Sequence, residues 1–307
     1  FDLLLTLFDS LRKLSTETPT EQKSKSPLID RFFHDLSRPD IFQLIRHKLL
    51  QLQTSESKTL EALEQSLQYF TPEVIPFLMP VMIQNRSPEV QQLVSKVIVQ
   101  LCRHDLGPLE KIAEQHSEEM GDRLLSILIH LEGDRVNKIL YRICDHPSNK
   151  VRRNAINALV ERDPQYTPKL FSLIDDPVKE IRACILAAFS KHESRELEDL
   201  LLNYLQEISA QKEIAHILAC YRALGHCGSN KAVPFLSGIL LSHGWNSVMG
   251  SGKPVFREGA AIALALLGTP EAKDVLQKAS KSKFKVVRNA FEKRKPVSAF
   301  SGKNTND

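Results

Sequence analysis

The sequence is poor in aromatic residues and lacks the motifs that are typical of catalytic sites. Aromatic side chains make up 7% of the 307 residues, and Trp245 is the single tryptophan. This scarcity does not exclude a folded protein, because Leu, Ile, Val and Ala can fill a core of stacked helices. No GxGxxG, Walker-type loop, GxSxG or HExxH motif occurs. The sequence therefore predicts no catalytic residues, no cofactor, no bound metal and no enzymatic activity.

Long apolar runs and paired cysteines are also absent. No segment reaches the roughly 20 apolar residues that a transmembrane helix needs, so no membrane span is expected. The five cysteines form no CxxC pair, and most lie in apolar helical runs such as IRACILAAF. A free thiol in such a run behaves as a small hydrophobic side chain. Reduced cysteines, and hence a cytoplasmic protein, are expected.

Positive charge is concentrated at the C-terminal end. The formal net charge is +4, and residues 281–307 contain eight Lys or Arg against two Asp or Glu, a net of +6. The rest of the chain is therefore at −2 by subtraction. The candidate polyanion patch comprises Lys281, Lys283, Lys285, Lys293, Arg294 and Lys295. The alternative is that these residues keep the terminal repeat soluble, as the end of a helical array requires.

Helical periodicity and short Pro- or Gly-bearing breakers run along the chain. Apolar residues recur at three- and four-residue spacings in segments such as VRRNAINALV and EGAAIALALLG. HPSNKVRRNA (146–155) aligns with DPVKEIRACI (176–185) at a period of 30 residues. A second pattern predicts partner helices that begin at a Ser or Thr N-cap, at Thr71, Ser229 and Thr269. The sequence thus predicts repeated pairs of helices.

The pattern Asp-Pro-x-x-x-Val-Arg-x-x-Ala in units of about thirty residues resembles the HEAT repeat of bacterial proteins, and particularly the HEAT-like units of phycobilisome lyases. This resemblance implies an all-α superhelix, a solenoid in which Val and Ala face the core and Asp caps the helix. Asp occurs only at Asp176, and its place is taken elsewhere by Asn85, His146, Ser251 and Ser282. Arg is present at Arg152, Arg182, Arg257 and Arg288, with Gln91 in its place once. We interpret these arginines as a structural ladder, with polyanion contacts as the alternative.

Four segments are expected: an amphipathic helix (1–14), a polar linker (15–27), a HEAT-like array (28–295, degenerate over 28–69) and a disordered tail (296–307). An insertion at 242–254 separates the two helices of one repeat. Insertions of this kind often lie on the binding face of a repeat array. Trp245, Met249 and Lys253 are therefore the candidate partner-binding residues. The alternative for Trp245 is that it packs back on its own array.

The expected function is that of a protein-interaction scaffold that binds a protein or peptide partner. A nucleic-acid binder that uses the basic C-terminal segment is the alternative, by analogy with HEAT-like DNA glycosylases. A tetrapyrrole lyase is a third possibility, implied only by the repeat resemblance. HEAT-like iron hydroxylases carry several His-Glu pairs, whereas this sequence has only His192–Glu193, so no metal site is expected.

Overall fold

The computed structural model describes residues 31–52, 57–67, 69–191, 193–242 and 254–294, together with residues 6 and 10. Every regular element within these residues is a helix, which confirms the expected all-α repeat fold. The elements are α3 (Pro39–Gln51), α4 (Ser57–Leu67), η1 (Pro72–Val74), α5 (Ile75–Gln84), α6 (Pro88–Leu101), α7 (Gly107–Ile112), α8 (Glu118–Leu128), α9 (Asp134–Ile143), α10 (Asn149–Arg162), η2 (Pro164–Asp175), α11 (Lys179–Phe189), α12 (Arg195–Glu207), α13 (Ile214–Cys227), η3 (Asn230–Ala232), α14 (Val233–Leu241), α15 (Pro254–Leu267), α16 (Pro270–Ser280) and α17 (Lys285–Lys293).

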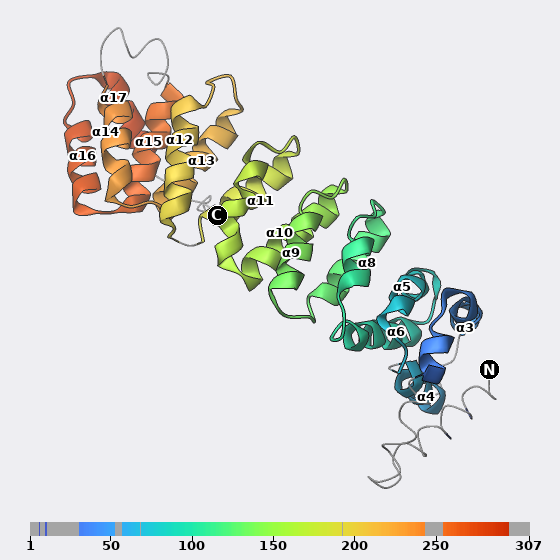
Figure 1. Ribbon diagram of the computed structural model, residues 1–307. Helices are drawn as coiled ribbons and strands as arrows, with labels where there is room; N and C mark the ends of the chain where they lie inside the picture. Colours follow the sequence, from blue (N-terminus) through green and yellow to red (C-terminus); the bar gives the residue numbers. More distant parts are fainter. Residues whose placement is uncertain are drawn as a thin grey trace, which may run out of the picture. The chain divides into compact units, whose positions relative to one another are not determined.

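The chain divides into two compact units, residues 1–159 and 160–307, and each is a stack of helix pairs. In the first unit, α5 packs on α3, α6, α7 and α8. In the second unit, α13 packs on α11, α12 and α15, and α15 packs on α14, α16 and α17 (Figure 1). A helix therefore contacts both its partner and the equivalent helix of the next pair. This is how a solenoid buries its apolar faces without one central core.

A close approach between α13 and α15 organises the core of the second unit. Tyr221 on α13 is fully buried, and a Cβ atom added to Gly259 on α15 would lie 2.2 Å from its Cδ2 atom. Ala260 and Ala263, on the same helix as Gly259, are also fully buried. The run of small residues thus lets α15 accept the ring of Tyr221 against its backbone.

The predicted N-caps hold at two of the three positions. The Ser229 hydroxyl accepts a hydrogen bond from the Lys231 N–H at 3.2 Å, and the Thr269 hydroxyl accepts one from the Ala272 N–H at 3.3 Å. The prediction is wrong for Thr71, whose side chain caps nothing. Its position is fixed instead through its backbone, because the Thr71 N–H donates to the Ser37 hydroxyl at 3.0 Å.

The terminal segments expected from the sequence lie outside the described residues. This applies to the helix over 1–14, apart from residues 6 and 10, to the linker over 15–27, and to the tail over 296–307. Among the helices that the structure does describe, each is too short or too polar to cross a membrane.

Candidate functional site

Four turns that precede a second helix of a pair are closed by the same two hydrogen bonds, which we call a cap-and-brace unit. The side chain of its first residue accepts from the backbone N–H two residues later, and the carbonyl oxygen of that residue accepts from an Arg or Gln six residues later. In the Asp176 unit, the Val178 N–H donates to Oδ1 at 2.8 Å, and Nη1 of Arg182 donates to the carbonyl oxygen at 2.9 Å. The other units pair Asn85 with Gln91, His146 with Arg152, and Ser282 with Arg288.

The fourth predicted arginine of the ladder, Arg257, makes a related contact across the insertion. Its Nη2 donates to the carbonyl oxygen of Ser242, fifteen positions earlier, at 3.2 Å. Arg152 and Arg257 are buried, and the side chain of Arg182 is only 18% exposed. These guanidinium groups lie against the backbone of their own repeats, which leaves little of them for a polyanion.

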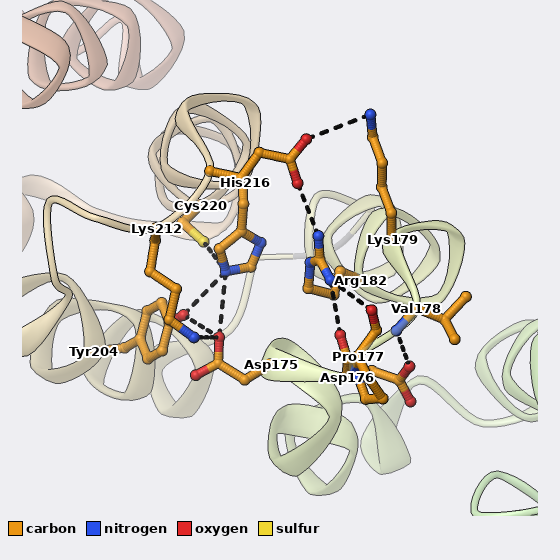
Figure 2. Close-up of polar contacts among 11 residues, drawn as sticks. Asp175, Asp176, Pro177, Val178, Lys179, Arg182, Tyr204, Lys212, His216 and Cys220 are labelled. Atoms are coloured by element: carbon orange, nitrogen blue, oxygen red, sulfur yellow. Dashed lines mark hydrogen bonds and ion pairs between the residues drawn. The ribbon is translucent and has the colours of Figure 1, made fainter.

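Arg182 also reaches the following helix pair. Its Nη2 donates to Oε2 of Glu213, the residue before α13, at 2.9 Å, and Nζ of Lys179 lies 3.4 Å from Oε1 of the same carboxylate. The carboxylate therefore bridges two cations of α11. This contact is one edge of a larger polar junction between the η2–α11 and α12–α13 pairs (Figure 2).

The centre of that junction is the Asp175–His216 cluster, which comprises Asp175, Tyr204, Lys212, His216 and Cys220. Lys212 Nζ and the Tyr204 hydroxyl meet Oδ1 of Asp175 at 2.6 and 2.7 Å. Nε2 of His216 lies 3.0 Å from the Tyr204 hydroxyl, 3.6 Å from Asp175 Oδ1 and 3.7 Å from Cys220 Sγ. Figure 2 shows these side chains pointing toward one another from η2, α12, the connection before α13, and α13 itself.

Burial sets the protonation states of this cluster. The side chain of His216 is 4% exposed, and burial lowers its pKa in spite of the nearby Asp175. Burial on its own raises the pKa of Asp175, but hydrogen bonds from Lys212 and Tyr204 outweigh it and hold that pKa below the ordinary value. Burial also raises the pKa of Cys220 to about 12. At neutral pH the cluster thus contains one carboxylate–ammonium pair, a neutral imidazole and a protonated thiol.

The hydrogen bonds fix one arrangement of protons. The Tyr204 hydroxyl donates to the carboxylate of Asp175, so its oxygen is left to accept from Nε2–H of His216. Nδ1 of His216 is then a bare acceptor, and it is buried with no hydrogen-bond partner among the described residues. The cluster joins two helix pairs through charge and hydrogen bonds, and its thiol is not activated as a nucleophile.

A second candidate site, the C-terminal surface, comprises Lys281, Lys283, Phe284, Lys285 and Val286. Phe284 and Val286 are 46% and 53% exposed, although both are large apolar side chains. The three lysines are exposed and make no ion pair within the part of the chain that the structure describes. Apolar area and unpaired positive charge therefore alternate along this short segment.

Two other residues of the predicted polyanion patch, Lys293 and Arg294, have partners within the chain. Lys293 pairs with Glu258 at 3.2 Å, and Arg294 donates to the Phe291 carbonyl while its guanidinium lies over the ring of that residue. Both side chains are thus engaged within the last repeat. Lys295 lies outside the described residues.

Several residues singled out from the sequence fall in undescribed segments. Trp245, Met249 and Lys253 lie between the end of α14 and the start of α15, and His192 lies before α12. The partner-binding role of the first three stays a prediction. Among the described residues, no group of three His, Cys, Asp or Glu side chains is arranged to hold a metal ion.

Sequence reasoning missed the Asp175–His216 cluster. A partial signal exists, because His216 and Cys220 are four residues apart and so share a helix face, and Asp175 directly precedes the Asp176 cap. The partners of His216 come from different helices, however, and only the packing of the pairs brings them together.

Comparison with known proteins gives one family match and two distant structural likenesses. Residues 256–282 match the model of the PBS lyase HEAT-like repeat, whereas no curated protein matches the sequence. Human deoxyhypusine hydroxylase in complex with glycerol is similar at 16% identity, over 88% of this chain and 96% of that chain, with a TM-score of 0.32. An engineered protein is similar at 16% identity, over 94% of this chain and 87% of that chain, with a TM-score of 0.31.

One of these likenesses corrects the prediction that the chain is not an enzyme. Deoxyhypusine hydroxylase is an enzyme with a HEAT-like fold, so a HEAT-like fold does not by itself exclude catalysis. At a TM-score of 0.32 the likeness assigns no reaction to this chain. The family match at 256–282 supports a HEAT-repeat protein, and the stacked helix pairs and the recurring cap-and-brace units agree with it.

Proposed function

We propose that this HEAT-repeat protein binds a partner protein through an acidic, partly apolar segment that docks on the C-terminal surface. The supporting observation is the exposure of Phe284 and Val286 beside three lysines that have no ion pair in the described part of the chain. Exposed apolar side chains cost free energy in water, and covering them is favourable. The positively charged lysines around them select a partner that carries negative charge.

The composition of this surface fits the same role. Its segment is polar through its lysines and yet retains two large exposed apolar residues. A partner that supplies carboxylates and apolar side chains together would satisfy both.

A nucleic acid is the second candidate ligand, and the same three lysines favour it. A polyanion that binds through lysines alone releases counterions, so its affinity falls steeply with salt. Phosphate contacts give no role to Phe284 and Val286, whereas an apolar side chain of a peptide would cover them. This difference separates the two candidates experimentally.

Fluorescence anisotropy with three labelled probes tests the proposal. The probes are an acidic peptide with Leu at every third position, the same peptide with Ser in place of Leu, and single-stranded DNA. We expect saturable binding of the Leu peptide and weaker binding of the Ser peptide, because the Ser peptide covers no apolar area. Tighter binding of DNA than of either peptide would instead favour the nucleic-acid candidate.

Two sets of variants locate the site. Combined K281E, K283E and K285E should weaken binding of the Leu peptide about tenfold, close to 1.4 kcal/mol. A matched control reverses three exposed cations elsewhere, K48E, R86E and K111E, which changes the net charge equally and should leave affinity within about twofold. The proposal fails if the Leu peptide does not bind, or if both triple variants weaken it equally.

A further inference from the structure

One of the four cap-and-brace units depends on the imidazole of a histidine. In the His146 unit, the backbone N–H of Ser148 donates to Nδ1 of the ring at 3.0 Å. The equivalent acceptors in the other units belong to Asn85, Asp176 and Ser282. Histidine is the residue type among these whose charge ordinarily changes between pH 5 and 8. The four turns thus share one geometry, and the turn at His146 is the one whose cap changes its charge in mild acid.

The hydrogen bond from Ser148 requires a neutral imidazole. Nδ1 accepts through its lone pair, so the single ring proton must be on Nε2. A second proton would be bound at Nδ1 and would face the N–H of Ser148, a donor against a donor. Protonation of His146 therefore replaces a hydrogen bond with a repulsive contact just before α10.

The surroundings of the His146 ring disfavour a positive charge. The residue is 5% exposed, and its ring centroid lies 6.4 Å from that of His116, in the connection before α8. The buried guanidinium of Arg152, on α10, donates to the His146 carbonyl oxygen at 2.8 Å and adds a cation to the same turn. Burial and His116 lower the pKa of His146, and the carbonyl groups of Ser117 and Gln115 only partly offset them. The ring is therefore neutral at neutral pH.

The same turn holds α10 against the preceding helix pair. A Cβ atom added to Gly121, on α8, would lie 3.4 Å from Nε2 of His146, so the ring packs close to the α8 backbone. Two carboxylates of α8 bind side chains at the start of α10, Glu118 with the Ser148 hydroxyl and Asp122 with Lys150. Ser148 thus has two roles, because its N–H closes the turn and its hydroxyl contacts α8. A shift of Ser148 changes both contacts together.

We propose that the His146 unit is a pH-sensitive contact within the first unit of the chain, in which protonation of Nδ1 breaks the bond from the Ser148 N–H and loosens the start of α10 from α8. The proton comes from the solvent as the pH falls toward about 5. The Asn85 and Ser282 units have caps that do not titrate, so they stay closed. This proposal does not rest on the C-terminal surface.

Hydrogen exchange of the full chain, followed by mass spectrometry at pH 7.5 and pH 5, tests the proposal. After correction for the intrinsic pH dependence of exchange, we expect protection of the amides over 148–155 to fall about five- to tenfold at pH 5. This is the range expected for the loss of one N-cap. Protection over 85–91 and 282–288 should change less than about twofold, which makes these turns internal controls in the same protein.

Three variants assign the effect to the His146 ring. His146→Asn installs the cap that Asn85 provides, and it should keep protection over 148–155 at both pH values. His146→Ala removes the cap, and it should lower this protection at both. His130→Asn makes the same substitution at an exposed histidine, and it should leave the acid-induced loss unchanged. Circular dichroism at both pH values establishes that each variant is folded.

The proposal is overturned if the parent protein shows no loss of protection over 148–155 at pH 5. A loss of equal size in all three turns would also overturn it, because acid would then act on the whole fold. These two comparisons need no variant. Persistence of the acid-induced loss in folded His146→Asn, or its disappearance in His130→Asn, would refute the role of His146.

Discussion

Replacing Tyr221 with Phe should make the protein more stable, which is unusual for a change in a fully buried side chain. The hydroxyl of Tyr221 is buried and has no partner among the described residues. Its removal relieves a desolvation penalty of about 1–3 kcal/mol, and the lost dispersion contacts of one oxygen atom offset only part of this gain. We therefore expect the free energy of unfolding to rise by about 1 kcal/mol.

The same substitution at Tyr204 provides a matched control of opposite sign. The Tyr204 hydroxyl donates to the carboxylate of Asp175 at 2.7 Å and contacts Nε2 of His216 at 3.0 Å. Hydrogen bonds to a charged group contribute about 1.5–3 kcal/mol, but Asp175 is 43% exposed and keeps Lys212 as a partner. Tyr204→Phe should therefore lower the free energy of unfolding by about 1 kcal/mol.

Urea denaturation followed by far-ultraviolet circular dichroism at neutral pH measures both variants against the parent protein. An unchanged dependence on urea concentration would assign the change in midpoint to stability. The reasoning is refuted if Tyr221→Phe destabilises the protein by more than about 0.5 kcal/mol, because the hydroxyl would then have a partner, such as a buried water. Equal shifts for the two variants would refute it as well.

Three further predictions concern stability. Gly259→Ala should lower the free energy of unfolding by about 1–3 kcal/mol, because its Cβ atom would collide with Tyr221. Gly238→Ala should raise the free energy of unfolding by up to about 1 kcal/mol, since alanine favours the helix and its Cβ atom meets only open space. Thermal unfolding compares the two variants. Arg182→Met should lower the free energy of unfolding by about 1–3 kcal/mol, because the Asp176 carbonyl oxygen and its neighbours lose their hydrogen-bond donor. An unchanged free energy of unfolding in urea denaturation would contradict the stabilising role of Arg182. Because burial lowers the pKa of His216 below its unfolded value of about 6.5, the unfolded state takes up a proton first as the pH falls, so stability should decline from pH 6.5 toward pH 5. His216→Gln should reduce the dependence of the free energy of unfolding on pH by up to about 1.4 kcal/mol per pH unit. An equal slope in both proteins would be evidence against a lowered pKa of His216.

The repeat pattern could be predicted from the sequence because its signals are local. The thirty-residue spacing of Arg152 and Arg182 and the Pro-bearing breakers fixed the helix pairs, and the structure shows α10 and α11 at these positions. Side chains whose partners are far along the chain could not be predicted in this way. Tyr221 meets Gly259 thirty-eight positions later, and nothing in either helix specifies which residue of the neighbouring repeat it will face.

The candidate sites divide along the same line. The composition of residues 281–295 predicted a basic cluster. It could not show that Lys293 and Arg294 have partners in the last described repeat, whereas Lys281, Lys283 and Lys285 have no ion pair among the described residues. The Asp175–His216 cluster left only a partial signal in the spacing of His216 and Cys220, because it depends on η2, α12 and α13 meeting.

The cap-and-brace unit has a consequence for how readily such repeats can be recognised. Its acceptor is a backbone carbonyl oxygen, which every amino acid possesses, and its cap accepts through Asp, Asn, Ser or a neutral His. The geometry therefore tolerates many different amino acids at these positions. Even Nε2 of Gln91 donates to the carbonyl oxygen of Asn85 at 2.7 Å, in the place that an arginine takes in the other units. The same hydrogen-bonded turn occurs at residues 85, 146, 176 and 282, whereas the family match covers only 256–282. In arrays of this kind, repeats whose sequences have diverged can still be recognised by the hydrogen bond from a side chain to the carbonyl oxygen of the cap residue.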